Sequence, residues 1–475
     1  MPFPEEEADF EKESSSYSQT SFSVKGDVFL ILDLPAGYTV GIDTFAITAK
    51  TSQISGFRDI PPGPHFLWVS EPNAVTRCGC WFVTTELGEV HAKQFTPFGD
   101  ILGDPESLLD SQSRKAKAQE LYSRLLPHDY GCDKRDAAVR PPHTDPLTGK
   151  WGLGYSIPTD SKSLWRELTS AISPSFLSRI TGKTNVQEWL VETSDSAKGE
   201  STIPAPHKQF ISPSGGDLNF TFAQDIIDLD LLNASSIPGV SNDPTSRILA
   251  LLNTSNRPGS QAITESDIVA ELQFTFITGL HIGNYACLEK WWDLLLKIIL
   301  RANQLVLRCP SLCEKLLRTL HCQLIYSDRY ITREGSGGDS LNGNQDGDND
   351  VRTGILDTIP QNKPKLRRAL STYIRRVEMS LRTAGTNVNP EYANVTGALV
   401  DLEMWFWEYG WDLRRGVQDE PRSGDGGRSR QGMEGTFDDD RDDNDGDNDD
   451  SEEGYAPVVV ELDDQGREVG LLTWD

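Results

Sequence analysis

The apolar residues of this 475-residue chain change their spacing near residue 263. Before that position, short runs rich in β-branched and aromatic residues alternate with turns that contain Gly or Pro, a pattern typical of β-strands. After it, apolar residues recur every three or four positions, which indicates amphipathic helices. A chain of this length exceeds the usual size of one domain. We therefore predict an α+β multidomain protein with a β-rich N-terminal domain and an all-α C-terminal domain.

The N-terminal domain is expected over residues 21–155 as a β-sandwich-like fold. Residues 106–126 follow its strands with the apolar spacing of a helix. Residues 156–262 combine a predicted helix at 164–180 with loops rich in Pro, Ser and Gly, so we interpret them as a connector. The runs of strand length lie at 28–34, 44–49, 65–69, 80–85 and 89–95.

The C-terminal domain, residues 263–415, is expected to contain five or six helices. Thr264 and Asp267 have the spacing of a capping box, in which each side chain accepts a hydrogen bond from the other residue's amide. Pro310 is placed for the first turn of a helix, the one part of a helix that tolerates proline well. Residues 333–350 are rich in Gly, Asn and Asp and are interpreted as an insert without regular structure.

Acidic residues concentrate near both ends of the chain. The chain carries 45 Lys and Arg against 72 Asp and Glu, a net charge of −27. Residues 1–20 and 416–454 have few apolar side chains and are predicted to be disordered, with the densest negative charge at 438–453. This acidic balance argues against binding to nucleic acid through phosphate neutralisation. We expect no direct, specific nucleic-acid binding.

Beyond the acidic linker, residues 455–475 contain apolar runs that favour strands. A strand in such a short tail has no local surface on which to bury itself. We therefore predict that it adds to the edge of a sheet in another protein. The predicted partner-binding residues are Pro457, Val458, Val459, Val460, Glu461 and Leu462.

The remaining features indicate a soluble intracellular protein. The first residues do not resemble a secretory signal, and no apolar run approaches the roughly 18 residues needed to span a membrane. The seven cysteines are an odd number and are interpreted as reduced thiols. We predict no membrane association and no stable homo-oligomer.

Motifs for bound ligands are incomplete. Thr181-Gly-Lys-Thr184 resembles the end of a phosphate loop, but Leu177 stands where the first glycine belongs. Residues 441–452 imitate a calcium loop, yet Arg441 occupies the first ligand position. The cysteines at 78, 80, 309, 313 and 322 lack the spacing of a zinc site and are interpreted as core residues. We predict no cofactor and no metal.

No arrangement of residues indicates a reaction. His65 follows a Pro- and Gly-rich turn at the start of a predicted strand, and the sequence suggests no catalytic partner for it. A hydrolase centred on His65 is therefore a minor alternative to a histidine that packs against the turn. We predict no catalytic residues and no enzyme activity.

Three separated motifs resemble one family. Gly41-Ile-Asp43 and the segment from Gly56 to Leu67 match its Gly-Ile-Asp and Pro-Pro-Gly-x-His-Phe patterns. Glu271-Leu-Gln-Phe-Thr-Phe-Ile277 matches the start of its helical domain, and Ala456-Pro-Val-Val-Val-Glu-Leu462 matches its C-terminal strand. In order and spacing the chain resembles the A1-cistron splicing factor family, whose members assemble the U5 small nuclear ribonucleoprotein (U5 snRNP).

This resemblance implies a chaperone-like assembly factor of the nucleus and cytoplasm, with a VHS-like helical domain. Members of the family hold pre-mRNA-processing-splicing factor 8 by its C-terminal RNase H-like and Jab1/MPN-type domains. Their tail lies as an added strand between those domains, before the spliceosomal helicase takes the factor's place. The alternative is a VHS-type adaptor that binds sorting peptides in membrane trafficking.

Overall fold

A computed structural model describes most of the chain outside its acidic segments. Residues 1–419 form one compact unit and residues 420–475 another. The segments predicted to be disordered, 1–20, 333–350 and 416–454, lie outside the described residues, as does the calcium-like loop. Within the described part, no helix is both long and apolar enough to cross a membrane. The described residues are 26–48, 54–72, 74–84, 88–96, 101–108, 110–130, 160–184, 188–198, 216–223, 226, 243–253, 263–331, 354–384, 390–414, 460–462 and 468–471.

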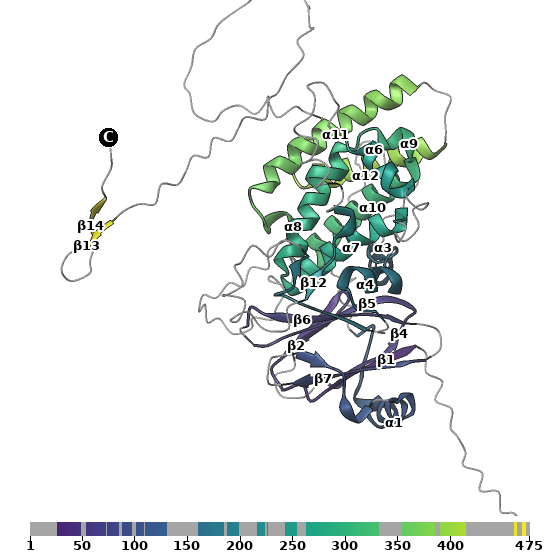
Figure 1. The fold of residues 1–475 in the computed structure, drawn as a ribbon, viewed down its shortest axis with the longest axis vertical. Coiled ribbons are helices and arrows are strands. Elements are labelled where there is room, and N and C mark those ends of the chain that lie inside the picture. The colour runs from purple at the N-terminus through teal and green to yellow at the C-terminus, as the bar shows by residue number, and fades with distance from the viewer. Residues whose placement is uncertain are drawn as a thin grey trace, which may run out of the picture. The chain divides into compact units, whose positions relative to one another are not determined.

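Two five-stranded sheets form the N-terminal part of the larger unit (Figure 1). The first has the order β8 (Ile101–Gly103), β7 (Val90–Thr96), β1 (Asp27–Leu32), β4 (Gly56–Ile60) and β9 (Leu126–Pro127). The second has the order β10 (Glu188–Glu192), β6 (Arg77–Thr84), β5 (Gly63–Ser70), β2 (Thr39–Ile42) and β3 (Phe45–Thr48). All five predicted strands are confirmed. The other strands of the two sheets, β2, β4, β8, β9 and β10, were not predicted from the sequence.

Strand β1 shows why the two sheets pack together. Its side chains alternate between two buried faces, as the two-residue period of a strand requires. Phe29 and Ile31 enter the apolar core between the sheets, whereas Val28 and Leu30 pack toward helix α1 (Ser111–Leu121). Because both faces are covered, β1 is a continuous apolar run rather than an alternating one.

The helical region is built around α7 (Glu265–Ile282). The predicted capping box is confirmed, because Thr264 Oγ1 accepts from the Asp267 amide at 3.2 Å and Asp267 Oδ2 accepts from the Thr264 amide at 2.7 Å. Pro310 begins α10, as predicted. The other helices of the region are α6 (Thr245–Asn253), α8 (Tyr285–Asp293), α9 (Leu305–Arg308), α10 (Pro310–Tyr326), α11 (Asn362–Ala384) and α12 (Pro390–Glu408).

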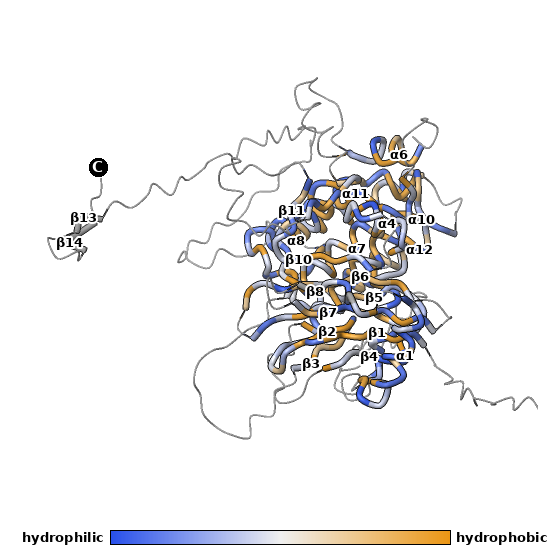
Figure 2. Tube along the Cα trace, turned by 60° about the horizontal axis from the view of Figure 1, so that its bottom comes forward, coloured by the Kyte–Doolittle hydropathy of each residue, from blue (hydrophilic) through white to orange (hydrophobic). Residues whose placement is uncertain are grey.

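The second sheet and α7 share one hydrophobic core (Figure 2). The indole of Trp81 on β6 donates to Thr278 Oγ1 on α7 at 3.1 Å, and its ring centre lies 5.8 Å from that of Phe274. Phe66 on β5 packs beside Trp81 and also occupies the space where a side chain at position 79 would lie, so Gly79 permits the close approach. The sheet and the helices are therefore one packed body, whereas the sequence suggested two separate modules.

The described parts of the connector belong to this core as well. The predicted helix at 164–180 is instead two helices, α3 (Ser161–Leu168) and α4 (Pro174–Thr181), because the Ser173 hydroxyl caps α4 and Pro174 starts it. Both helices bury apolar residues against the shared core, and β10 extends the second sheet beside β6. The predicted connector thus joins the sheets to the helices by packing between them.

We predict that Trp81→Ala destabilises the whole larger unit. Truncating a fully buried Trp costs about 3–5 kcal/mol of unfolding free energy, and here it also leaves Thr278 without its indole partner. Urea unfolding followed by circular dichroism measures the loss. Val75→Ala, at a side chain that is 87% exposed, is the control and should stay within about 0.5 kcal/mol. Loss of sheet structure with an unchanged helical transition would contradict a shared core.

Candidate functional site

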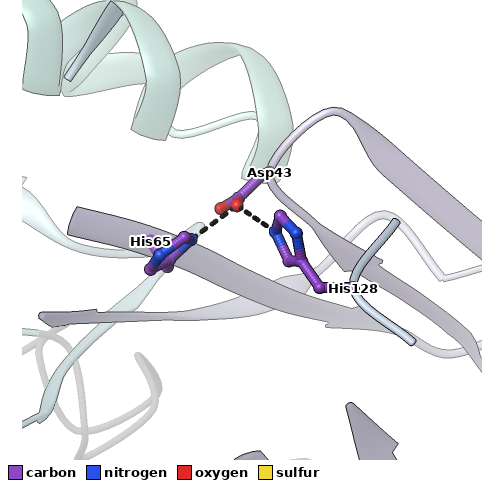
Figure 3. Close-up of side chains that lie close together, drawn as sticks. All are labelled: Asp43, His65 and His128. Carbon is purple, nitrogen blue, oxygen red and sulfur yellow. Dashed lines mark hydrogen bonds and ion pairs between the residues drawn. The ribbon is translucent and has the colours of Figure 1, made fainter. Parts of the chain in front are cut away.

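Three titratable side chains meet at the edge of the second sheet (Figure 3). Asp43 lies in the turn between β2 and β3, His65 lies on β5, and His128 follows β9. Asp43 Oδ2 is 2.6 Å from His65 Nδ1 and 2.8 Å from His128 Nε2. One carboxylate oxygen of Asp43 therefore lies within hydrogen-bond distance of both imidazoles.

Backbone geometry fixes the carboxylate of Asp43. The residue occupies the first position of a two-residue hairpin turn with φ of 53°, a left-handed conformation that Asp tolerates better than most residues. Its second carboxylate oxygen accepts from the Phe66 amide at 3.0 Å, and its own amide donates to the Phe66 carbonyl at 2.9 Å. The carboxylate thus has little freedom to turn away from the histidines.

The same turn is tied to the helical region. The hydroxyl of Tyr326, near the end of α10, donates to the Asp43 carbonyl oxygen at 3.2 Å. That hydroxyl also lies 2.9 Å from His281 Nε2 on α7. The position of the Asp43 turn therefore depends on the packing of α7 and α10.

The two histidines keep Asp43 ionised. Burial alone would raise its pKa, but the charges and hydrogen bonds of His65 and His128 outweigh that cost and hold the pKa of Asp43 far below its ordinary value. His65 Nε2 lies 2.8 Å from the Pro61 carbonyl oxygen, and its ring stacks on Phe82. Asp43 and His65 are buried, and His128 is the most exposed of the three.

A cavity of about 260 Å³ opens beside the cluster. Its lining includes Asp43, His65 and His128 and, from α3, Lys162 and Arg166. The indole of Trp165, also in the lining, donates to the Pro64 carbonyl at 3.0 Å and fixes α3 against the Pro-rich turn. Two basic side chains and two imidazoles in one lining suit this cavity to a small anionic group, although Lys162 Nζ also lies 3.5 Å from an Asp129 carboxylate oxygen. The cluster itself has the donor types that bind transition metals.

A second group of buried charges joins the two sheets. His91 Nδ1 on β7 lies 3.0 Å from Glu188 Oε1 on β10, and Lys93 Nζ lies 3.4 Å from Glu188 Oε2. Burial lowers the pKa of His91, but the hydrogen bond to Glu188 and the Asp27 carboxylate 3.8 Å from Nε2 outweigh it, and the net shift is upward. Because positive charges already neutralise these carboxylates, we interpret the group as an ion network that positions β10.

The predicted partner-binding residues fall at the boundary of the described tail. Val460, Glu461 and Leu462 form β13, whereas Pro457, Val458 and Val459 lie outside the described residues. β13 pairs antiparallel with β14 (Glu468–Leu471), with Glu461 opposite Gly470. The sequence predicted a strand that pairs with a partner, and this internal pairing was not expected. A two-stranded hairpin still leaves one edge of each strand available to another sheet.

The weak ligand motifs have structural explanations. Gly182 of the phosphate-loop-like segment ends α4 with φ of 67°, whereas a phosphate loop precedes a helix. Cys313 is buried beside the Tyr373 hydroxyl, and burial raises its pKa to about 11, so it is an unreactive thiol. Cys309 Sγ lies 3.2 Å from a carboxylate oxygen of Glu265 on α7. These thiols contribute to packing, as expected.

Sequence reasoning missed the partners of His65. Asp43 and His65 both lie in segments that the sequence singled out, but 22 positions separate them. The antiparallel register of β2 and β5, with Ile42 opposite Leu67, brings them together. His128 follows the predicted helix and carried no motif. The sequence therefore held only an indirect signal for the contact: Asp43 and His65 belong to two motifs, and the strands of these motifs, β2 and β5, pair with each other.

We predict that Asp43→Asn lowers the unfolding free energy by about 3 kcal/mol, because it replaces the charged oxygen that both imidazoles share with an uncharged amide. Chemical unfolding at neutral pH measures this change. Asp33→Asn is the matched control, since Asp33 is also left-handed, with φ of 56°, but is exposed. It should change stability by less than about 0.5 kcal/mol. Equal effects of the two substitutions would contradict a special role for the cluster.

Comparison with known proteins agrees with the motifs that carry this site. No curated protein sequence matches the chain. Residues 25–182, which contain both sheets except β10 and include Asp43, His65 and His128, match the family description "AAR2 N-terminal domain". Residues 235–414, which contain the helical region, match "AAR2 C-terminal repeat region". The chain therefore belongs to the AAR2, or A1-cistron splicing factor, family.

Proposed function

We propose that this protein is a U5 snRNP assembly factor that binds the C-terminal RNase H-like and Jab1/MPN-type domains of pre-mRNA-processing-splicing factor 8. The family match over both parts of the larger unit is the observation that supports this proposal, because it gives the chain a splicing-related assembly role. In this proposal, bound protein keeps the spliceosomal helicase from docking early. The helical region acts as a VHS-like domain.

The tail supplies the second contact. A strand of the partner pairs with the free edge of β13, and backbone hydrogen bonds provide the docking while alternate side chains provide specificity. The hairpin of β13 and β14 supports this mode of binding, because it shows that the tail readily adopts extended backbone. Two contacts on one chain raise the overall affinity above that of either alone.

The proposed role is one of binding rather than catalysis. The protein would work in the cytoplasm and the nucleus, without direct, specific binding to nucleic acid. The net charge of −27 supports the last point, because phosphate backbones repel an acidic surface.

We predict that Glu461→Pro weakens binding to the scaffold fragment by about tenfold or more. Proline removes a backbone donor from the centre of β13 and prevents strand pairing there. Glu461→Thr is the matched control, because it also loses the carboxylate but keeps the donor and favours strands. Calorimetric titration of the fragment with the full-length variants measures both affinities.

A chain lacking residues 455–475 should behave like Glu461→Pro. Equal loss of affinity in Glu461→Pro and Glu461→Thr would contradict docking through the backbone and indicate a side-chain contact. Wild-type affinity in all variants would refute the tail mechanism but keep the partner. If the full-length protein does not bind the fragment at all, the proposed partner is wrong, and binding to sorting peptides becomes the function to test.

A further inference from the structure

We propose that Asp43, His65 and His128 bind one divalent transition-metal ion of the zinc class, through Asp43 Oδ2, His65 Nδ1 and His128 Nε2. The inference is independent of the splicing role. The three ligand atoms come from different segments of the fold and lie within 4.8 Å of one another. Two imidazoles and one carboxylate are a donor set that zinc and related ions use in proteins.

The hydrogen bonding of His65 calls for a positive charge between the side chains. Nε2 lies 2.8 Å from the Pro61 carbonyl oxygen, which can only accept, so Nε2 carries a hydrogen. In a neutral ring Nδ1 then holds a lone pair, and it lies 2.6 Å from an oxygen of Asp43. Two lone pairs repel at that distance. Either a second ring proton or a metal ion must therefore occupy the space between them.

The surroundings of His65 match those of a metal ligand. Metal-bound histidines commonly donate their other ring N–H to a backbone carbonyl, which fixes the tautomer and the orientation of the ring. The Pro61 carbonyl provides this contact, and the Phe82 ring stacks on the imidazole. Asp43 is fixed in turn by the Phe66 amide on its second oxygen. Two of the three ligands are thus oriented before any ion binds.

The spacing requires only a small adjustment. Zinc–ligand bonds of 2.0–2.2 Å at tetrahedral angles place ligand atoms about 3.3–3.6 Å apart. The present separations of 2.6 and 2.8 Å would have to open by about 0.5–1 Å. His128 can make its part of this movement, because it lies outside the regular strands and its side chain is 11% exposed. The separation between Asp43 and His65 opens only if these two buried side chains shift.

The cavity supplies the fourth coordination position. All three side chains line it, so an ion held by them would face its interior. Lys162 and Arg166 line the same cavity and favour an anionic fourth ligand, a hydroxide or a carboxylate. The Asp27–Glu89–His91 group also has ligand-type atoms close together. It is less suitable, because Lys93, 3.4 Å from Glu188 in the same network, already contributes positive charge.

The test is a titration of metal-free full-length protein with Co²⁺, whose visible absorption reports coordination by protein ligands. We expect one equivalent to bind, and at least a tenfold loss of affinity in His128→Ala, chosen because it is the most exposed ligand. His207→Ala is the control, since it removes a histidine outside the described residues and should bind like wild type. Circular dichroism confirms that each variant is folded.

A second measurement does not depend on any variant. X-ray absorption of the wild-type protein loaded with one equivalent of Zn²⁺ should show two imidazoles, oxygen ligands and no sulfur. Absence of binding at micromolar Co²⁺ would overturn the proposal and leave a proton in the place of the metal. Binding that survives in folded His128→Ala, binding lost in His207→Ala, or sulfur in the zinc shell would overturn it as well.

Discussion

The fold depends on the burial of one aromatic face of the second sheet against α7. Phe66, Trp68 and Trp81 pack against this helix. Most residues of α7 are buried, and the buried residues occur on all faces of the helix. Fully burying side chains of this size contributes roughly 2–3 kcal/mol each, so the contact is a major part of the stability. Because sheet and helices share it, neither is expected to keep its structure alone.

This packing also fixes the positions of buried polar side chains. The Asp43 turn extends from strands of the same sheet, and Tyr326 holds it from α10. Buried charges are costly to desolvate and stay only when they are well paired. The Asp43 cluster and the His91 network meet that condition, and both define which strands and helices may lie next to each other.

Features set by neighbouring residues were predictable from the sequence, whereas features set by distant contacts were not. The capping box at Thr264 and the helix start at Pro310 depend on a few consecutive residues, and both were predicted correctly. The five apolar strands were also found. The burial of α7 on all its faces was not predicted. Its spaced apolar residues suggested one buried face, but the second sheet buries a further face of the helix. Likewise, the contact of His65 with Asp43 requires the register of β2 and β5, which no local pattern encodes.

A packed unit and a strand-forming tail together suit a protein that holds a large partner at two places. In the proposed function, β13 pairs with a strand of the scaffold. Isolated two-stranded hairpins are marginally stable in water, so the amides of residues 460–462 should exchange quickly in the free protein. Hydrogen exchange of the full-length protein, with and without the scaffold fragment, tests this pairing. We expect strong protection of these amides in the complex; unchanged fast exchange in a saturated complex would contradict the pairing.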